Sequence, residues 1–238
     1  QSLVRRGYRD PHGTFATNVS GTNNLLQALA EIDTTRAIVV TTTDKVYRNS
    51  DDGRAFVETD PLGGHDPYSA IGGGDWAEDR LIPDAVRAWS SGKALQVRRP
   101  DATRPWQHVL EPLRGYLVLA EKLMSGTDIA PAYNFGPGTD SATVRKVLSL
   151  AAAEFGNVRT DFADSAEGPV EAQVLALNPS RAETDLGIHS LWDLDRTVTM
   201  TAQWYRAYLE GGPVRELCKA DCDAYLDGVK RASVAGIR

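Results

Sequence analysis

The sequence predicts an α/β protein organised around a parallel β-sheet. The run 37–40 is apolar and mostly β-branched, without alternation of polar and apolar residues, which is typical of a strand covered on both faces. The preceding segment, 11–33, places its apolar residues at helical spacing. A helix that leads into a buried strand is half of a βαβ unit, the repeating element of doubly wound sheets. The chain is therefore expected to contain part of such a sheet.

Periodicity and glycine stops predict the other elements. Helices are expected over 80–92, from His108 to a stop at Gly126, over 142–155, from a capping box at Ser180–Glu183 to Gly187, and over 194–209. Short strands are expected at 94–98, 131–136 and 173–177, and a frayed tail over the last dozen residues.

Composition and charge narrow the classes of function. The chain has 238 residues, 42% of them hydrophobic, which suffices for one large domain or one and a half. A net charge of −6 argues against nucleic-acid and membrane-surface partners, which require a basic excess. No apolar run approaches membrane-spanning length and the first residues lack a signal-peptide pattern, so we expect a cytoplasmic protein. Cys218 and Cys222 are the two cysteines of the sequence, too few for a disulfide framework or a zinc site. We therefore expect them to be ordinary thiols.

Polar side chains follow the 37–40 run at once. They are Thr41, Thr42, Thr43, Asp44 and Lys45. In open α/β sheets ligands bind beyond the carboxyl ends of the strands, so hydroxyls, a carboxylate and an amine at this place form a candidate active site. A solvated turn explains the same residue types about equally well.

A second candidate site is a cluster of arginines. Arg98, Arg99 and Arg104 fall within seven residues of an otherwise acidic chain, and guanidinium groups suit bidentate contact with phosphate. On composition alone, a solvated loop with an arginine stacked on Trp106 is the better interpretation.

A family resemblance favours the functional interpretation of both clusters. The strand end Thr-Thr-Asp-Lys-x-Tyr at 42–47, followed by Asp-Pro-Tyr-Ser at 66–69, resembles the extended short-chain dehydrogenase/reductase family of nucleotide-sugar enzymes. Lysine at position 45 is most similar to the CDP-glucose 4,6-dehydratase branch of that family. The helix motif Asn-Val-x-Gly-Thr at 18–22 and the segment Arg-Pro-Trp-Gln-His-Val at 104–109 are also similar to the family's.

The resemblance implies a fold and a domain plan. The fold is a Rossmann-like doubly wound parallel sheet whose first strands lie upstream of Gln1, with a smaller α/β substrate-binding domain. Residues 1–75 would be the carboxy-terminal part of the NAD-binding domain, with a gap after 70. Residues 76–225 would mostly bind the nucleotide sugar, with some segments returning to the first domain, and 226–238 would form a tail.

The resemblance also implies site residues and partners. The catalytic residues would be Thr43, Asp44, Lys45 and Tyr68. NAD would contact Thr41, Thr42 and Tyr68, and the nucleoside-diphosphate sugar, CDP-glucose, would contact Arg80, Arg98, Arg104, His108 and Asn134. A homodimer or homotetramer is expected. Tyr68 would take the proton of the sugar O4, Thr43 would hydrogen-bond that oxygen, and Asp44 would protonate the leaving hydroxyl. Lys45 stands where relatives keep a glutamate base, a role that requires a lowered pKa.

The sequence departs from the family pattern at two places. No Gly-x-Gly-x-x-Gly loop precedes the first helix, and Gly72 stands where the family has a lysine four residues after its tyrosine. A natural shortening or an omitted segment after Ala70 explains the second departure, and the motif order on both sides favours omission. Two alternatives stay open: an epimerase or decarboxylase of the same family, and a non-catalytic module that binds sugar nucleotides or forms a dimer.

Overall fold

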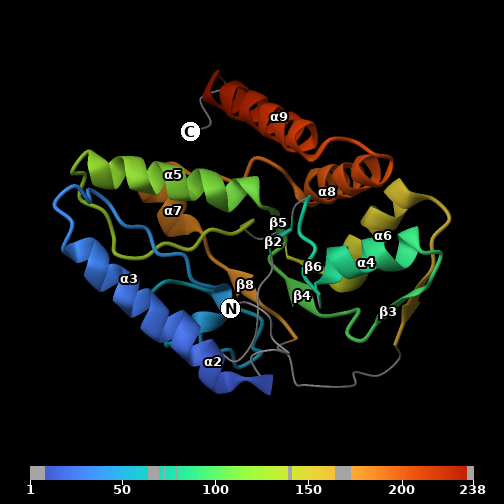
Figure 1. Cartoon of the computed structure of the whole chain (residues 1–238), viewed down its shortest axis with the longest axis horizontal. Helices are drawn as coiled ribbons and strands as arrows, with labels where there is room; N and C mark the ends of the chain where they lie inside the picture. Colours follow the sequence, from blue (N-terminus) through green and yellow to red (C-terminus); the bar gives the residue numbers. More distant parts are fainter. Residues whose placement is uncertain are drawn as a thin grey trace.

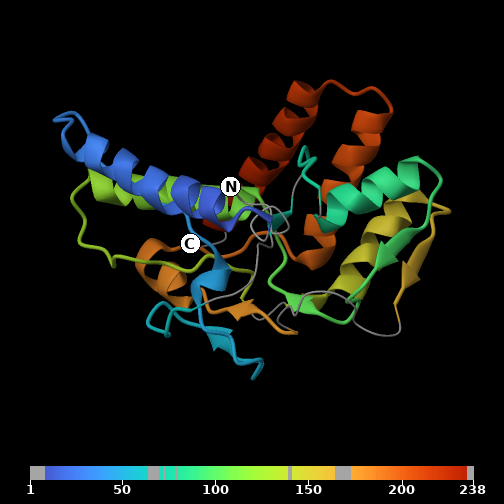
Figure 2. The same cartoon turned by 60° about the horizontal axis from the view of Figure 1, so that its bottom comes forward.

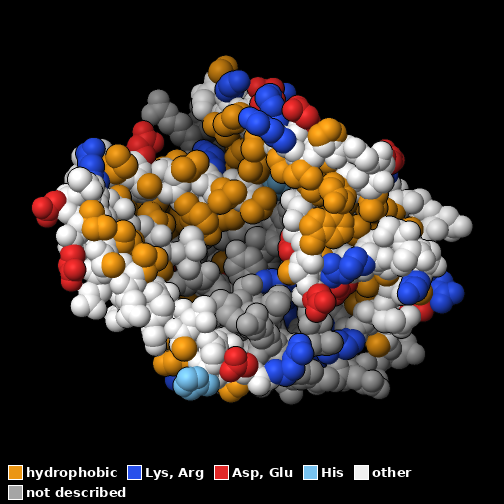
Figure 3. All heavy atoms as spheres, in the orientation of Figure 1, with side chains coloured by type: hydrophobic (Ala, Val, Ile, Leu, Met, Phe, Trp, Pro, Cys, Tyr) orange, Lys and Arg blue, Asp and Glu red, His pale blue; other side chains and the backbone are white. Residues whose placement is uncertain are grey.

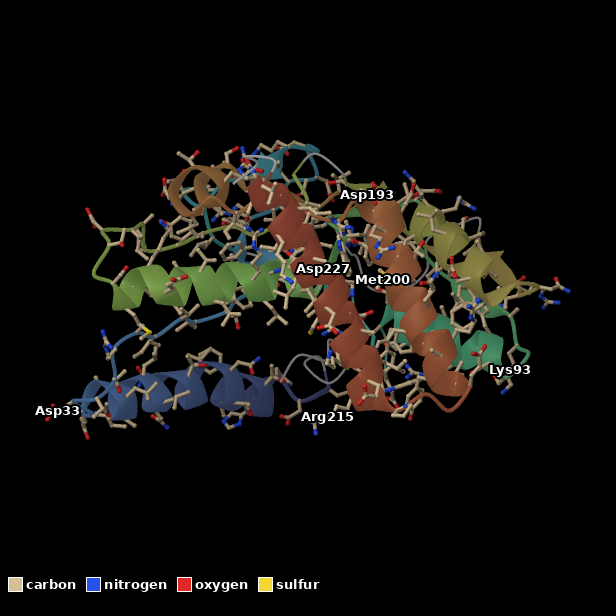
Figure 4. All side chains as sticks on the ribbon, turned by 90° about the horizontal axis from the view of Figure 1, so that it is seen from above. Asp33, Lys93, Asp193, Met200, Arg215 and Asp227 are labelled. Carbon is tan, nitrogen blue, oxygen red and sulfur yellow. The ribbon has the colours of Figure 1, made fainter. Side chains whose placement is uncertain are left out.

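Two groups of helices lie on either side of a set of short strands (Figures 1 and 2). The computed structural model describes residues 9–63, 70–71, 73–78, 80–138, 141–163 and 173–234. One group consists of α2 (Pro11–Phe15), the π-helical turn η1 (Ala16–Ser20), α3 (Gly21–Ala30), α5 (Leu110–Met124) and α7 (Ser180–Leu186). The other consists of α4 (Leu81–Ser90), α6 (Val144–Phe155) and α8 (Leu194–Leu209). The long helix α9 (Val214–Val234) lies between α5 and α8 when seen from above (Figure 4).

The strands of the described residues pair two by two. The parallel pairs are β1 (Ala55–Phe56) with β8 (Ala176–Leu177), β2 (Ala70–Ile71) with β5 (Gln107–His108), and β3 (Leu95–Val97) with β7 (Thr160–Phe162). The antiparallel pair is β4 (Thr103–Arg104) with β6 (Ala142–Thr143). Parallel partners must be joined by long crossover connections, as the predicted α/β class requires.

The largest core lies in the second group of helices and confirms the predictions made there. Val86 of α4, Leu148 of α6 and Tyr205 of α8 are fully buried in one apolar cluster. Gly92 and Gly156 follow α4 and α6 with positive φ angles, a conformation that glycine adopts without strain. Helical periodicity located these elements because their apolar stripes face this core.

The prediction of a buried strand at 37–40 is wrong. The segment forms no strand with any described residue, and Ile38 and Val40 are 38% and 50% exposed. A β-branched run becomes a sheet strand only when neighbouring strands satisfy its backbone groups and cover its side chains. No such neighbour lies among the described residues.

Two further predictions of local structure need correction. Residues 131–136 form no strand; the chain there is tied instead by side chains, including the amide of Gln107, which donates to the Phe135 carbonyl at 2.9 Å. Helix α7 does begin at Ser180, but the side chain of Asn178 accepts from the Ser180 amide at 2.9 Å, so no capping box at Ser180 starts the helix.

The prediction of a frayed tail over the last dozen residues is wrong up to Val234, because helix α9 continues to that residue. Tyr225 is buried, and Gly228 and Ala232 lie one and two turns further along the same face, half-buried. This spacing keeps one face of α9 against the body of the protein. No helix among the described residues has the length and apolarity needed to span a bilayer.

Apolar side chains remain uncovered on the first group of helices. Leu25 of α3 and Leu117 of α5 are 59% and 73% exposed, and Leu113 and Met124 are also exposed. Figure 3 shows hydrophobic atoms gathered over this half of the face, beside a hollow between the two groups of helices. The predicted amphipathic stripes of α3 and α5 are therefore present but face outward.

Gly73 packs directly on α8, and this contact predicts a stability effect. A Cβ at position 73 would lie 2.1 Å from Cγ of Trp204, far inside van der Waals contact. We expect Gly73→Ala to lower the free energy of unfolding by about 1–3 kcal/mol, the usual cost of overpacking, measured by urea denaturation. Gly21→Ala is the control, because its Cβ would meet only an ordinary contact at 3.7 Å. Equal stability of both variants would contradict the close packing.

Candidate active site

A short 3₁₀ turn, η2 (Asp44–Val46), presents the predicted catalytic residues. Thr43 caps it: its hydroxyl accepts from the Lys45 amide at 3.3 Å and donates to Oδ1 of Asp44 at 3.0 Å. The side chain of Lys45 is buried. The predicted residues Thr43, Asp44 and Lys45 thus form one ordered turn, in which the threonine orients the carboxylate.

Asp44 is half-buried and lies within electrostatic range of Lys45 and Arg104. Burial raises the pKa of its carboxyl group, while the charges of Lys45 and Arg104 and the Thr43 hydroxyl partly offset that rise. Arg104, in β4, is itself buried, and its Nη1 donates to the Thr103 carbonyl at 2.8 Å. The structure therefore brings the two predicted clusters, the strand end and the arginine segment, to the same place.

Asn134 adjoins this turn but serves Tyr47 and the backbone. Its Oδ1 accepts from the Tyr47 hydroxyl at 2.6 Å, and its Nδ2 donates to the Phe56 carbonyl at 3.0 Å. Tyr47 stacks on Phe56 with ring centroids 5.1 Å apart. The backbone amide of Asn134 donates to Oε1 of Glu58 at 2.8 Å. These contacts give Asn134 a structural role beside η2. Its predicted contact with the sugar stays a prediction.

His108 contacts Trp192, in the loop before α8. Its ring is buried against Trp192, with centroids 4.7 Å apart, and burial lowers its pKa to about 4. The imidazole is therefore neutral at physiological pH, as a structural histidine would be. Its predicted contact with the substrate stays untested.

The remaining predicted site residues are spread over the surface. Thr41 and Thr42 are exposed just before η2, and Arg98 is exposed at the end of β3. Arg80 precedes the first residue of α4 and is partly buried. Tyr68 lies outside the described residues, so its proposed role stays a prediction. Among the residues described, no group of three or more side chains is arranged to hold a metal ion.

Sequence reasoning missed two carboxylates with structural roles near the site. Glu58 binds the Asn134 amide and lies 3.6 Å from Nε of Arg181. Glu111, in the first turn of α5, is 5% exposed and accepts three hydrogen bonds. The apolar neighbours of Glu111 on its helix gave the only available signal, since a charged residue on an apolar face requires partners.

Comparisons with known proteins identify the family. A family model described as GDP-mannose 4,6 dehydratase matches residues 1–71. The CDP-glucose 4,6-dehydratase of Salmonella typhimurium is 33% identical over 270 residues, covering 97% of this chain and 75% of that enzyme. The low-salt glycan biosynthesis protein Agl12 of Haloferax volcanii is 25% identical, covering 86% of this chain and 73% of that protein.

Solved structures of related fold agree with this match. A UDP-glucose 4-epimerase from Stenotrophomonas maltophila with bound NAD has a TM-score of 0.75 at 18% identity, over 89% of this chain and 75% of that one. A dTDP-glucose 4,6-dehydratase from Bacillus anthracis in complex with NAD has a TM-score of 0.67 at 21% identity, over 85% and 71%. These likenesses confirm the predicted Rossmann-like α/β fold.

The alignment with the Salmonella enzyme spans 270 positions, whereas this chain has 238 residues, so that enzyme has residues without a counterpart here. With identity above 30% over nearly the whole chain, the protein belongs to the extended short-chain dehydrogenase/reductase family, among its nucleotide-sugar 4,6-dehydratases.

Proposed function

We propose that the protein dehydrates CDP-glucose to CDP-4-keto-6-deoxyglucose with bound NAD. The observation that carries the proposal is the buried carboxyl of Asp44, held by Thr43 and flanked by Lys45 and Arg104. Elimination of water across C5 and C6 needs an acid and a base close together, and this turn supplies one candidate for each. The preference for CDP is supported by the 33% identity with the Salmonella enzyme.

The residues before η2 fit the nicotinamide end of NAD. Thr41 and Thr42 expose hydroxyl groups immediately beside the ordered turn, and a ribose is bound by such neutral hydrogen-bonding groups. We propose that these two residues and Tyr68 hold that end of the cofactor. Bound NAD would supply the oxidation of the sugar at C4 and the later reduction at C6.

The proposed roles of the chain follow from the chemistry of its side chains. Tyr68 takes the proton of the sugar O4, and Thr43 hydrogen-bonds the same oxygen. The 4-ketone then acidifies the C5 proton, which Lys45 removes. Asp44 donates a proton to the hydroxyl that leaves C6. Burial suits Asp44 to this task because a raised pKa keeps its carboxyl protonated nearer neutral pH.

The substrate's diphosphate is assigned to Arg104, and Arg98 and Arg80 are kept as further candidates for contact with the nucleotide sugar. Arg104 donates through Nη1 to the Thr103 carbonyl at 2.8 Å, and guanidinium groups suit charge-assisted contacts with phosphate oxygens. The family's assembly into a homodimer or homotetramer and a cytoplasmic location are likewise proposed for this chain.

Binding of the diphosphate by Arg104 can be tested by mutation. We expect Arg104→Ala to weaken binding of CDP-glucose about 10- to 100-fold, since a lost charge-assisted hydrogen bond costs about 1.5–3 kcal/mol, and to leave the weak binding of free glucose unchanged. Isothermal titration calorimetry of the full-length protein measures both. Arg159→Ala is the control, because Arg159 is exposed and pairs with Asp161 at 3.4 Å. Equal losses for both ligands would remove Arg104 from the phosphate site.

A further inference from the structure

Helix α9 contacts the segment after Arg104 through buried polar side chains. Tyr225, on the inner face of α9, donates its hydroxyl to Oε2 of Glu111 at 2.7 Å. The Tyr225 ring packs edge-on against Trp192, with centroids 5.3 Å apart. Tyr225 is 4% exposed and Glu111 is 5% exposed, so this contact is shielded from water.

Glu111 joins three elements at this point. Its other carboxylate oxygen, Oε1, accepts from the backbone amides of Leu191 and Trp192 at 3.0 and 2.9 Å. One side chain at the start of α5 therefore fixes both the loop before α8 and the middle of α9. A carboxylate with three donors has a strongly preferred position, so Glu111 sets where α5 begins relative to α9.

The ring of His108 also lies close to α9. Its Nδ1 accepts from the Leu110 amide at 3.3 Å, which leaves the proton of the neutral ring on Nε2. That Nε2 is buried, has no hydrogen-bond partner among the described residues, and lies 3.9 Å from Oδ2 of Asp221 on α9. A small movement of α9 toward His108 would complete this hydrogen bond.

The first half of α9 packs against the main core through Leu217, whereas its second half borders an open pocket of about 550 Å³ beside the loop before α8. The α9 residues along the pocket include Ala224, Gly228 and Ala232, whose side chains are too small to fill it. The second half of α9 is therefore held mainly by the buried hydrogen bond of Tyr225, with Asp221 lying close to His108.

The stretch from Arg104 to Glu111 is short and internally braced. The backbone amide of Trp106 donates to the Arg104 carbonyl at 3.0 Å. The indole nitrogen of Trp106 donates to the Ala142 carbonyl at 2.8 Å. His108 lies in β5, in register with Ile71 of β2. A shift at His108 or Glu111 is thus carried to Arg104 through a stretch that has little freedom to absorb it.

We propose that α9 is a clamp that positions the Arg104–Glu111 stretch for binding the nucleoside diphosphate, with Tyr225, Asp221 and Glu111 as positioning residues. This inference rests on the proposed role of Arg104 in phosphate binding. None of the three residues touches the substrate; they act through the place they give to Arg104.

The test measures binding of CDP, binding of NAD and thermal stability in the full-length protein. We expect Tyr225→Phe and Asp221→Ala each to raise the Kd for CDP about three- to tenfold while leaving the Kd for NAD unchanged. Asp221→Asn should restore binding, because its amide oxygen can accept from Nε2 of His108 as the carboxylate would. Controls are Asp223→Asn, whose side chain is exposed on α9 and pairs with Lys219, and Tyr208→Phe on α8.

The outcomes separate this inference from the proposed function. If the clamp variants melt at a lower temperature but bind CDP as tightly as the unmodified protein, α9 contributes to stability alone and the inference is overturned. If the unmodified protein binds no CDP, the proposed function itself fails. A selective rise in the Kd for CDP, reversed in Asp221→Asn, supports the clamp.

Discussion

Replacing Asp44 with Asn in the full-length protein is expected to stall the reaction after oxidation of the sugar. The proton of O4 is taken by Tyr68 in the proposed mechanism, so hydride should still reach NAD, while the hydroxyl at C6 loses its proton donor. Loss of a positioned acid typically costs about two to four orders of magnitude in rate. Single-turnover mixing with CDP-glucose should therefore show reduced cofactor accumulating at its near-ultraviolet absorbance. Lys45→Met should stall the same step, because the C5 proton then has no base to accept it.

Two other variants make this result specific. Tyr68→Phe should prevent cofactor reduction altogether, and Asp33→Asn, an exposed carboxylate before the 37–40 segment, should behave as the unmodified protein. Dehydration at the normal rate by both the Asp44 and Lys45 variants would make these residues structural. If product analysis of the unmodified protein instead showed no 6-deoxy-4-keto sugar, the alternative of an epimerase would be favoured.

Replacing Glu111 with Leu should cause a large loss of stability. The substitution leaves the amides of Leu191 and Trp192 and the hydroxyl of Tyr225 without their acceptor in a buried place. Each unsatisfied buried donor costs about 1–3 kcal/mol, so we expect the free energy of unfolding to fall by about 3 kcal/mol or more. Chemical denaturation monitored by tryptophan fluorescence is suitable, because Trp192 lies in the affected region.

Glu121→Leu is the matched control for this variant. Glu121 is on the same helix, but its side chain is exposed, so its replacement should change stability by less than about 0.5 kcal/mol. Similar losses in the two variants would show that helix α5 responds to the added leucine rather than to the missing carboxylate.

Helices and their ends could be predicted from the sequence because the information is local. The apolar stripes of α4, α6 and α8 repeat every three to four residues, and Gly92 and Gly156 mark where α4 and α6 end. Strands could not be predicted as well. Whether 37–40 or 131–136 is a strand depends on neighbours elsewhere in the chain, which an apolar run does not specify.

The site was predicted in part for the same reason. Thr43, Asp44 and Lys45 are adjacent in sequence, so their turn follows from local chemistry. The approach of Arg104 to Asp44 came from a family resemblance, since spacing alone favoured a solvated loop. The contact of Tyr225 with Glu111 joins residues far apart and left no periodic signal, and the residues of α9 that follow Tyr225 were expected to fray.

Strand β1 can pair only after the ribosome has synthesised β8, so folding of the segment around β1 is delayed during synthesis. Ala55 pairs with Ala176, so the segment that follows η2 waits for a partner at least roughly 120 residues further along. At about 5–20 residues per second, the ribosome needs a minimum of about 6–24 seconds to deliver that partner. Throughout this interval Phe56 has no Leu177 to pack against, and the stacked Tyr47 and Phe56 rings stay open to water. The nascent segment around Phe56 is thus expected to bind chaperones that recognise exposed aromatic side chains.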